Sequence, residues 1–241
     1  MAIAEAQQRR EAPYISEIET LSKELFSVID SKDFSDTERE RIDNAYHLAM
    51  RLHAQQNARS DGPYTHHILR VSIRVARTAG TTADCIVAAL LHDAVEDQPY
   101  ALSLLMRRRN GERVDRVARF QELFGEPVQD IVMLLTKKPR RLGHKKPEYR
   151  EFILGLVTDE RALLVKISDF LDNALGILEK PPELRGRLAR KWEPVVPLLI
   201  MALKHLKHEH GILNAATRQR LTAELEEAGR RLTLAMHKST K

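Results

Sequence analysis

The sequence predicts an all-α protein of about ten helices. Apolar residues recur at spacings of three and four along almost the whole chain, and runs with the alternating pattern of a β-strand are scarce. Ser35 stands three residues before Glu38, the signature of a capping box at a helix start. Pro and Gly at 61–63, 125 and 181–182 interrupt the periodic segments. The expected helices cover residues 14–30, 36–57, 64–78, 82–97, 112–124, 127–136, 149–157, 159–179, 183–209 and 214–237.

The length of 241 residues suits one domain or two small ones. Residues 1–13 are polar, and we expect them to be frayed ahead of the first helix. We divide the chain into an N-terminal extension with one helix (1–35), a main helical domain (36–210) and a C-terminal helix (211–241). This last helix packs on the domain or on a second subunit, and the second arrangement would make the protein a homo-oligomer.

The composition indicates the cellular compartment in which the protein works. Hydrophobic residues make up 43% of the chain, which excludes intrinsic disorder. The apolar stretch 195–203 is far shorter than the roughly 20 residues of a membrane span, and the first residues lack the apolar core of a signal peptide. The single cysteine, Cys85, excludes an internal disulfide and fits a reducing compartment. We therefore expect a cytoplasmic protein with no membrane partner.

The charge balance indicates an anionic ligand. Lys and Arg number 39 against 34 Asp and Glu, a net charge of +5. Aromatic residues make up only 5% of the chain and no zinc-knuckle cysteine set is present, so the means of stacking on nucleic-acid bases are scarce. We expect a small anionic molecule as the ligand, and no nucleic acid.

An apolar segment is followed directly by four ionisable side chains. Residues 85–91 are apolar all round, which predicts a buried helix. At about 3.6 residues per turn, a continuing helix would place His92 over Glu96, and Asp93 over Asp97. Carboxylates that are buried need a cation, a metal or water. A helix end that emerges into solvent is the alternative, but a His-Asp pair directly after a buried helix favours a metal site.

A second buried helix also carries polar residues. Its apolar pattern runs from 163 to 178, and within it Lys166, Asp169 and Asn173 fall on one stripe. Asp172 lies beside that stripe. A lone buried Asp is usually a structural acid, but an Asp with a Lys one turn before it and an Asn one turn after it favours a site.

A pair of histidines opens a third helix. His66 and His67 follow a Pro-Tyr turn, with Arg59 shortly before them. Two His and two Asp drawn from three helices could hold one divalent ion, such as Mn²⁺, Mg²⁺, Zn²⁺ or Fe²⁺. With carboxylates nearby to handle protons and basic residues to attract an anionic substrate, the set is typical of a hydrolase.

Four segments match, in order, the motifs of one enzyme family. Residues 59–67 contain P-Y-x-x-H, with His67 rather than His66 at the ligand position. Residues 88–97 match A-A-L-L-H-D-x-V-E-D in full, residues 124–137 end in L-T-K, and residues 165–173 match V-K-x-x-D-x-L-x-N. On these motifs, residues 40–205 resemble the HD-domain hydrolase module of the RelA/SpoT alarmone enzymes. The chain resembles the stand-alone small alarmone hydrolases, which have no synthetase domain.

The resemblance implies a fold, a reaction and roles for individual residues. The fold is an HD-domain helical bundle, and the reaction removes pyrophosphate from the 3′ position of (p)ppGpp to leave GDP or GTP, in stringent-response control. The implied metal ligands, typically for Mn²⁺, are His67, His92, Asp93 and Asp169. The implied catalytic residues, which orient and deprotonate the attacking water, are Glu96 and Asp97. The implied substrate contacts are Arg59 and Ser60 for the phosphates, Lys166 near the metal and Asn173 for the nucleoside.

Two departures from the family pattern leave the substrate open. Phe170 stands where the family often has Arg, and Ala174, Leu175 and Gly176 follow Asn173 where the family often continues x-R-T. These positions help to hold the nucleotide. An adenine alarmone such as (p)ppApp, NADPH or a dNMP therefore remains an alternative substrate. A regulatory or antitoxin-like binder with little catalysis is a further alternative, although all six implied metal and catalytic residues are present.

A basic loop lies between two of the motifs. Residues 137–148 are rich in Lys and Arg, and we expect Lys145 and Lys146 to close over the diphosphates of the substrate. A solvated loop with no contact to the ligand is the alternative. We assign the single tryptophan, Trp192, to the core.

Overall fold

The computed structural model describes residues 2–54, 56, 62–100, 102, 116–136, 149–206 and 211–238 of the chain. For residues 2–13, 116 and 117 it describes the backbone alone. All regular elements in these ranges are helices, and no β-strand occurs within them, so the all-α prediction is confirmed. None of these helices is both long enough and apolar enough to span a membrane.

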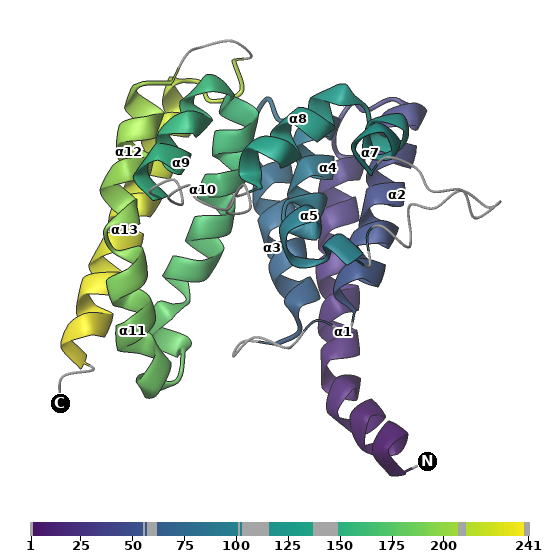
Figure 1. The fold of residues 1–241 in the computed structure, drawn as a ribbon, viewed down its shortest axis with the longest axis horizontal. Coiled ribbons are helices and arrows are strands. Elements are labelled where there is room, and N and C mark those ends of the chain that lie inside the picture. The colour runs from purple at the N-terminus through teal and green to yellow at the C-terminus, as the bar shows by residue number, and fades with distance from the viewer. Residues whose placement is uncertain are drawn as a thin grey trace, which may run out of the picture.

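Figure 1 labels the helices in chain order. The first half of the chain forms α1 (Ala2–Asp30), α2 (Asp36–His53), α3 (Tyr64–Ala76), α4 (Ala83–Leu91), α5 (Ala94–Asp97), α7 (Arg116–Phe124) and α8 (Glu126–Leu135). The second half forms α9 (Tyr149–Gly155), α10 (Glu160–Leu175), α11 (Pro182–Trp192), α12 (Val195–Lys204) and α13 (Ala215–Lys238), with short 3₁₀ turns η1 (Leu156–Thr158) and η2 (Ile177–Glu179). The capping box predicted at Ser35 and Glu38 begins α2, with both reciprocal hydrogen bonds present.

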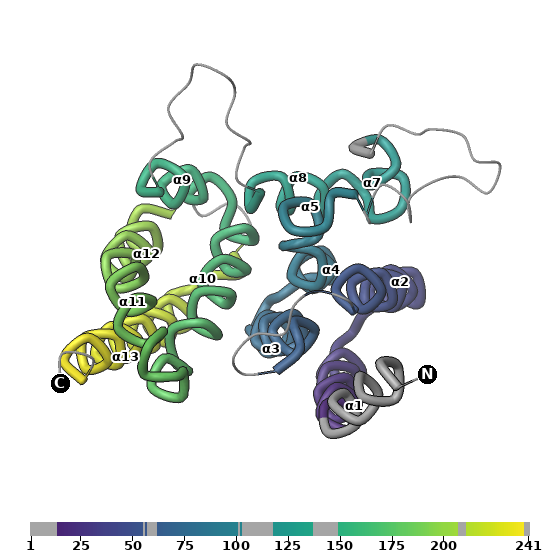
Figure 2. Tube along the Cα trace, turned by 60° about the horizontal axis from the view of Figure 1, so that its bottom comes forward, coloured from purple at the N-terminus to yellow at the C-terminus, as the bar shows by residue number. Residues whose placement is uncertain are grey.

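Helix α4 is the most buried element in the described residues. Ala83 and residues 85–91 have no exposed surface, as the apolar sequence predicted. The helix packs against α2, α3, α8 and α10, and Figure 2 shows it between α2 and α3 with α5 following it. A helix that is covered on all sides delivers whatever follows Leu91 into the interior of the protein.

Helix α10 joins the two halves of the molecule. It packs against α3, α4 and α8 on one side and against α12 and α13 on the other, and in Figure 1 it lies between these two groups. The polar stripe of α10 therefore lies between α3, which carries the paired histidines, and the helices of the C-terminal half.

The start of α10 also fixes the C-terminal helix. Glu160 is buried, and its two carboxylate oxygens accept hydrogen bonds from the backbone N–H groups of Ile212 and Leu213, at 3.0 and 2.9 Å. These two residues lead into α13, which packs on α10, α11 and α12. A carboxylate at a helix N-terminus is also favoured by the helix dipole.

The observed helices differ from the expected ones in two respects. Residues 2–12 are helical rather than frayed, because Ala, Glu, Gln and Arg in this stretch are strong helix formers. The expected helix 183–209 divides into α11 and α12 at Pro194, which has no N–H to donate.

The expected helix 82–97 also divides, and here the break lies at the predicted metal site. Helix α4 ends at Leu91, and the short helix α5 begins at Ala94. In a continuous helix the Ala89 carbonyl would accept the backbone N–H of Asp93, but it accepts Nδ1–H of the His92 side chain at 2.8 Å. A histidine side chain thus competes with the backbone for this carbonyl, and His92 and Asp93 lie in a turn.

We expect Leu90→Ala to destabilise the protein by about 2–5 kcal/mol, because it leaves a cavity inside the buried helix α4. The matched control is Leu234→Ala on α13, where the side chain is 44% exposed and the effect should stay within about 0.5 kcal/mol. Urea unfolding of the two variants measures the difference. Equal losses would contradict the central place of α4 in the core.

Candidate active site

Four side chains from three segments meet at the end of α4. One ligand atom from each of His67, His92 and Asp93 lies within 4.8 Å of the other two. Asp169 joins them from α10, with Oδ1 at 3.3 Å from Nε2 of His67. These are the four residues that the motifs implied as metal ligands. His66 faces the other way, with Nδ1 at 3.5 Å from Oε2 of Glu17 on α1.

His92 presents one ring nitrogen with no partner. Its Nδ1 donates to the Ala89 carbonyl, so Nε2 is the atom that faces the cluster. The ring is 4% exposed, and Nε2 makes no hydrogen bond with any described residue. Oδ2 of Asp93 lies 3.1 Å away, a contact that is an ion pair only when the ring is protonated. A buried ring nitrogen of this kind is free of competing hydrogen bonds and can therefore coordinate a metal ion.

Asp93 is held from the opposite side by a tyrosine. The hydroxyl of Tyr64 donates to Oδ2 of Asp93 at 2.5 Å, and the ring stacks on His53 at a centroid distance of 5.1 Å. The turn before Tyr64 needs Gly62, whose φ of +119° is in the region that favours glycine. A Cβ at this position would also lie 2.8 Å from Nδ1 of His66. The tyrosine of the Pro-Tyr motif thus orients Asp93, a candidate metal ligand.

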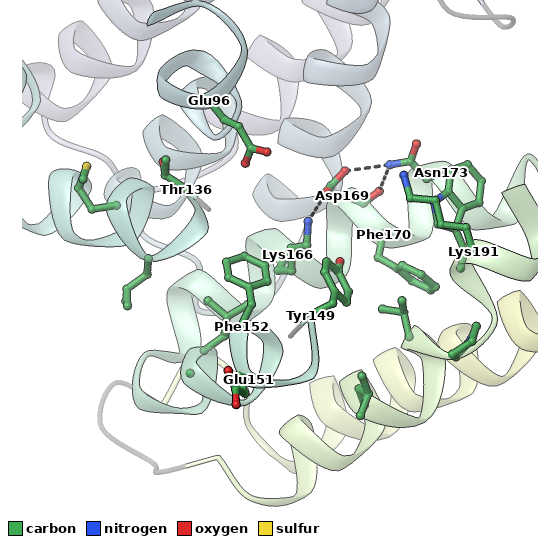
Figure 3. A pocket seen from close by; sticks show the side chains of 18 residues that line it. Glu96, Thr136, Tyr149, Glu151, Phe152, Lys166, Asp169, Phe170, Asn173 and Lys191 are labelled. Atoms are coloured by element: carbon green, nitrogen blue, oxygen red, sulfur yellow. Dashed lines mark hydrogen bonds and ion pairs between the residues drawn. The ribbon is translucent and has the colours of Figure 1, made fainter. Parts of the chain in front are cut away.

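Asp169 is fixed by the two residues that share its stripe. Oδ2 accepts from Nζ of Lys166 at 2.7 Å, and Oδ1 accepts from Nδ2 of Asn173 at 2.8 Å. Figure 3 shows both interactions as dashed lines. Nδ2 of Asn173 also donates to the Asp169 carbonyl at 2.8 Å. The helical stripe predicted from the sequence therefore forms one hydrogen-bonded unit.

Asp172 contacts the cluster, although the sequence motifs assigned it no role. Its Oδ2 lies 2.7 Å from Nδ1 of His67, and its two oxygens accept from Nε and one terminal nitrogen of Arg70, at 2.6 and 3.0 Å. The signal available in the sequence was spacing: Asp172 lies one helical turn after Asp169, and Arg70 one turn after His67. Neither spacing alone shows that α3 and α10 run side by side.

The protonation states follow from burial and from charge. Burial alone would lower the pKa of His92, but the carboxylates of Asp93 and Asp169 raise it to about 9. Burial would raise the pKa of Asp93, but the neighbouring His92 lowers it. Burial would also raise the pKa of Asp169, but Lys166 and His67 lower it well below its usual value. The pKa of Lys166 is raised because the ion pair with Asp169 outweighs burial. The positive charge favoured on His92 and the ammonium of Lys166 thus balance the half-buried carboxylates of Asp93 and Asp169.

The donor set fits a divalent metal. Two imidazole nitrogens and two carboxylates suit Mn²⁺, Fe²⁺ or Zn²⁺, and a mixed N and O set leaves the choice among them open. In both histidines the Nδ1 atom is used in a hydrogen bond, to the Ala89 carbonyl in His92 and to Asp172 in His67. The Nε2 atom of each ring is therefore the one that faces the carboxylates. Binding of a metal would displace a proton from His92, which is the usual linkage between metal affinity and pH.

A cavity of about 870 Å³ adjoins the cluster. This volume lies within the range of roughly 300–1,000 Å³ that small-molecule sites occupy. Asp169, Lys166 and Asn173 line it from α10, and Glu96 lines it from α5 (Figure 3). The other walls come from α8, α9, α11 and α12, so the cavity lies between the two halves of the molecule.

Aromatic side chains form much of the wall. Tyr149 and Phe152 come from α9, Phe170 from α10 and Trp192 from α11. Trp192, which we assigned to the core, packs against the edge of the core, where its side chain is half-buried and lines the cavity. Phe170, which stands where the related family often has Arg, is buried and lines the cavity. Lys191 adds an exposed cation on the side of Asn173 (Figure 3).

The two implied catalytic acids occupy different positions. Both are exposed, but Glu96 lines the cavity, whereas Oδ2 of Asp97 accepts from Nε2 of Gln56 at the end of α2, at 3.0 Å. The remaining implied contacts, Arg59 and Ser60 in the first motif and Lys145 and Lys146 in the basic loop, lie outside the described residues.

Comparison with curated proteins identifies the relatives that the motifs predicted. The guanosine-3′,5′-bis(diphosphate) 3′-pyrophosphohydrolase of Aquifex aeolicus is 31% identical over 154 residues, which cover 63% of this chain and 20% of that protein. The bifunctional (p)ppGpp synthase/hydrolase SpoT of Escherichia coli K12 is 27% identical over 176 residues, covering 70% and 23%. A probable GTP pyrophosphokinase of Mycobacterium leprae is 33% identical, covering 65% and 18%. The chain thus spans about a fifth of the length of these relatives.

A solved structure and a family model agree on the fold. A metazoan ortholog of SpoT, described as hydrolysing ppGpp and acting in starvation responses, superposes with a TM-score of 0.56 at 22% identity, covering 83% of this chain and 98% of the other. The model of the HD domain matches residues 45–195, which include the four clustered residues and most of the cavity wall. The chain belongs to the HD-domain family.

Proposed function

We propose that the protein is a metal-dependent hydrolase that removes the 3′-pyrophosphate of (p)ppGpp, with Mn²⁺ as its metal. The observation that carries the proposal is the cluster of His67, His92, Asp93 and Asp169 beside a nucleotide-sized cavity. HD domains imply divalent metal binding, and the relatives named above are (p)ppGpp hydrolases and synthases. We assign the activity to residues 36–210, and place the protein in stringent-response control in the cytoplasm.

The proposed ligands are His67 and His92 through Nε2 and Asp93 and Asp169 through a carboxylate oxygen each. A divalent ion held there supplies Lewis acidity, which stabilises charge on phosphoryl oxygens and lowers the pKa of water. The protein contributes the orientation of its own donors. Tyr64 holds Asp93, and Lys166 with Asn173 holds Asp169, so that the donors are arranged before a ligand arrives.

Glu96 is the proposed proton acceptor. Its carboxylate lines the cavity from α5, the short helix that follows His92 and Asp93 of the cluster. From there it can take the proton of the attacking water. Asp97 points to Gln56 in this structure, and we assign it the supporting role of orienting that water and the Glu96 segment.

The cations around the cavity would hold the phosphates. Lys166 donates to Asp169 and lines the cavity, so its ammonium can approach a phosphate beside the cluster. We extend the phosphate site with Arg59, Ser60, Lys145 and Lys146. Such groups stabilise the charge that develops on phosphoryl and leaving oxygens during pyrophosphate release.

The aromatic wall would hold the nucleoside. Phe170, Tyr149 and Trp192 offer flat apolar surfaces for a purine, and Asn173 offers an amide for the nucleoside. Phe170 in place of Arg supplies no hydrogen bond that distinguishes guanine from adenine. The adenine alarmone (p)ppApp therefore stays as a second candidate substrate. NADPH, dNMPs and a binder with little catalysis remain outcomes of the test.

A substrate screen with Mn²⁺ tests the proposed function. The purified protein is incubated with ppGpp, pppGpp, ppApp, NADPH and a dNMP, and pyrophosphate and orthophosphate are measured separately. We expect pyrophosphate together with GDP from ppGpp. Orthophosphate released only from NADPH or the dNMP would refute the alarmone assignment, and no turnover by metal-loaded protein would favour a binder.

Metal binding is tested with Asp93→Asn. We expect the affinity for Mn²⁺ to fall by more than about 100-fold, because removal of outer partners alone lowers metal affinity by about 10–100-fold. Asp84→Asn is the control, since Asp84 lies in the first turn of α4, the helix that precedes Asp93, and pairs with Arg41 at 2.6 Å, away from the cluster. Calorimetric titration measures both affinities, and an unchanged affinity in Asp93→Asn would disprove the ligand assignment.

The proton acceptor is tested with Glu96→Gln. We expect kcat for ppGpp to fall by about 10²–10⁴-fold, with the affinity for Mn²⁺ retained, since the change removes a base and not a ligand. Glu151→Gln on α9 is the matched control, because Glu151 also lines the cavity. A wild-type kcat in Glu96→Gln would show that another group accepts the proton.

A further inference from the structure

Helices α3 and α10 exchange two sets of contacts, one helical turn apart. At the first level, His67 of α3 lies beside Asp169 of α10, with Nε2 and Oδ1 separated by 3.3 Å. At the second level, three residues further along each helix, Arg70 pairs with Asp172. The two levels are connected, because Oδ2 of Asp172 reaches back to Nδ1 of His67 at 2.7 Å.

The geometry of the second level determines which nitrogen of His67 faces the cluster. An ionised carboxylate only accepts hydrogen bonds, so the Nδ1 atom beside Asp172 must carry a proton and donate it. The neutral ring then has its lone pair on Nε2, the atom that lies 3.3 Å from Asp169 and 3.9 Å from Asp93. His67 is 1% exposed, and water cannot readily substitute for Asp172 there.

Arg70 restrains Asp172 in turn. Nε and one terminal nitrogen of the guanidinium donate to separate oxygens of the carboxylate, at 2.6 and 3.0 Å. Such a two-point contact fixes the plane of the carboxylate as well as its position. The guanidinium also cancels the charge of Asp172, so a third carboxylate is present near Asp93 and Asp169 without adding net negative charge.

We propose that Arg70 and Asp172 form a positioning pair for His67, which sets the tautomer and orientation of the ring so that Nε2 is presented to a divalent metal. The inference rests on the metal role given to His67 in the proposed function. It adds two residues that are not ligands and do not line the cavity. Histidine ligands of metals commonly donate their other nitrogen to a carboxylate, and loss of that partner lowers metal affinity by about 10–100-fold.

Titration of the metal alone tests the pair without reference to hydrolysis. Mn²⁺ binding is followed by the electron paramagnetic resonance signal of the free ion, in the wild type, Asp172→Ala, Asp172→Asn and Arg70→Ala. We expect Asp172→Ala to weaken Mn²⁺ binding by about 10–100-fold. Asp172→Asn should restore part of this loss, because its amide oxygen can still accept from Nδ1, and Arg70→Ala should lie between the wild type and Asp172→Ala.

A neighbouring ion pair provides the matched control. Arg74, one turn beyond Arg70 on α3, is about as exposed as Arg70 and pairs with Glu224 of α13, away from the cluster. Arg74→Ala should lower thermal stability and leave Mn²⁺ binding unchanged. If the Arg70 and Asp172 variants also lose stability but bind Mn²⁺ like the wild type, the pair is only a brace between helices and the proposal is wrong.

Nitrogen-15 spectra of the histidine rings give a second measurement on folded wild-type protein. We expect His67 with its proton on Nδ1 in protein loaded with diamagnetic Zn²⁺, whose donor preferences the cluster also fits, and a proton on Nε2 would overturn the proposal. Wild-type protein that binds Mn²⁺ through His67 but releases no pyrophosphate from ppGpp would refute the proposed function and leave the positioning pair in place. Wild-type protein that binds no Mn²⁺ at His67 would refute both.

Discussion

The structure depends on keeping two carboxylates close together inside the protein. Burial would raise the pKa of both, and repulsion from Asp169 adds to this at Asp93, but His92 holds the pKa of Asp93, and Lys166 that of Asp169, below the usual range. The His92 ring and the ammonium of Lys166 compensate with positive charge. Hydrogen bonds from Tyr64 and Asn173 hold Asp93 and Asp169 in position, and Asp172 holds His67. A site that needs this much positive charge in one place is well suited to a divalent cation.

The fold serves this arrangement. Helix α4 is apolar on every side, so that it can pass through the centre of the protein and end at the cluster. Helix α10 contacts both halves of the molecule, with Asp169 toward α3 and Phe170 in the cavity wall. The carboxylate of Glu160 at the start of α10 binds the backbone before α13, which ties the C-terminal helix to the helix that carries the site.

Much of this could be predicted from the sequence, for physical reasons. The apolar run 85–91 required burial, and the stripe of Lys166, Asp169 and Asn173 required mutual contact on one helix face. Contacts between helices were harder to predict: the Arg70–Asp172 pair depends on the register of α3 against α10, which no local pattern encodes. The break after Leu91 was missed because the side chain of His92 competes for a backbone carbonyl. The cavity face of Trp192 was missed because a large apolar residue at the edge of a core can also line a ligand cavity.

Diffraction from crystals grown with Mn²⁺, recorded at a wavelength where manganese scatters anomalously, would test the central claim most directly. The account predicts one strong anomalous peak in contact with Nε2 of His67, Nε2 of His92 and carboxylate oxygens of Asp93 and Asp169. A fully occupied peak elsewhere, or none at this cluster at saturating Mn²⁺, would contradict it.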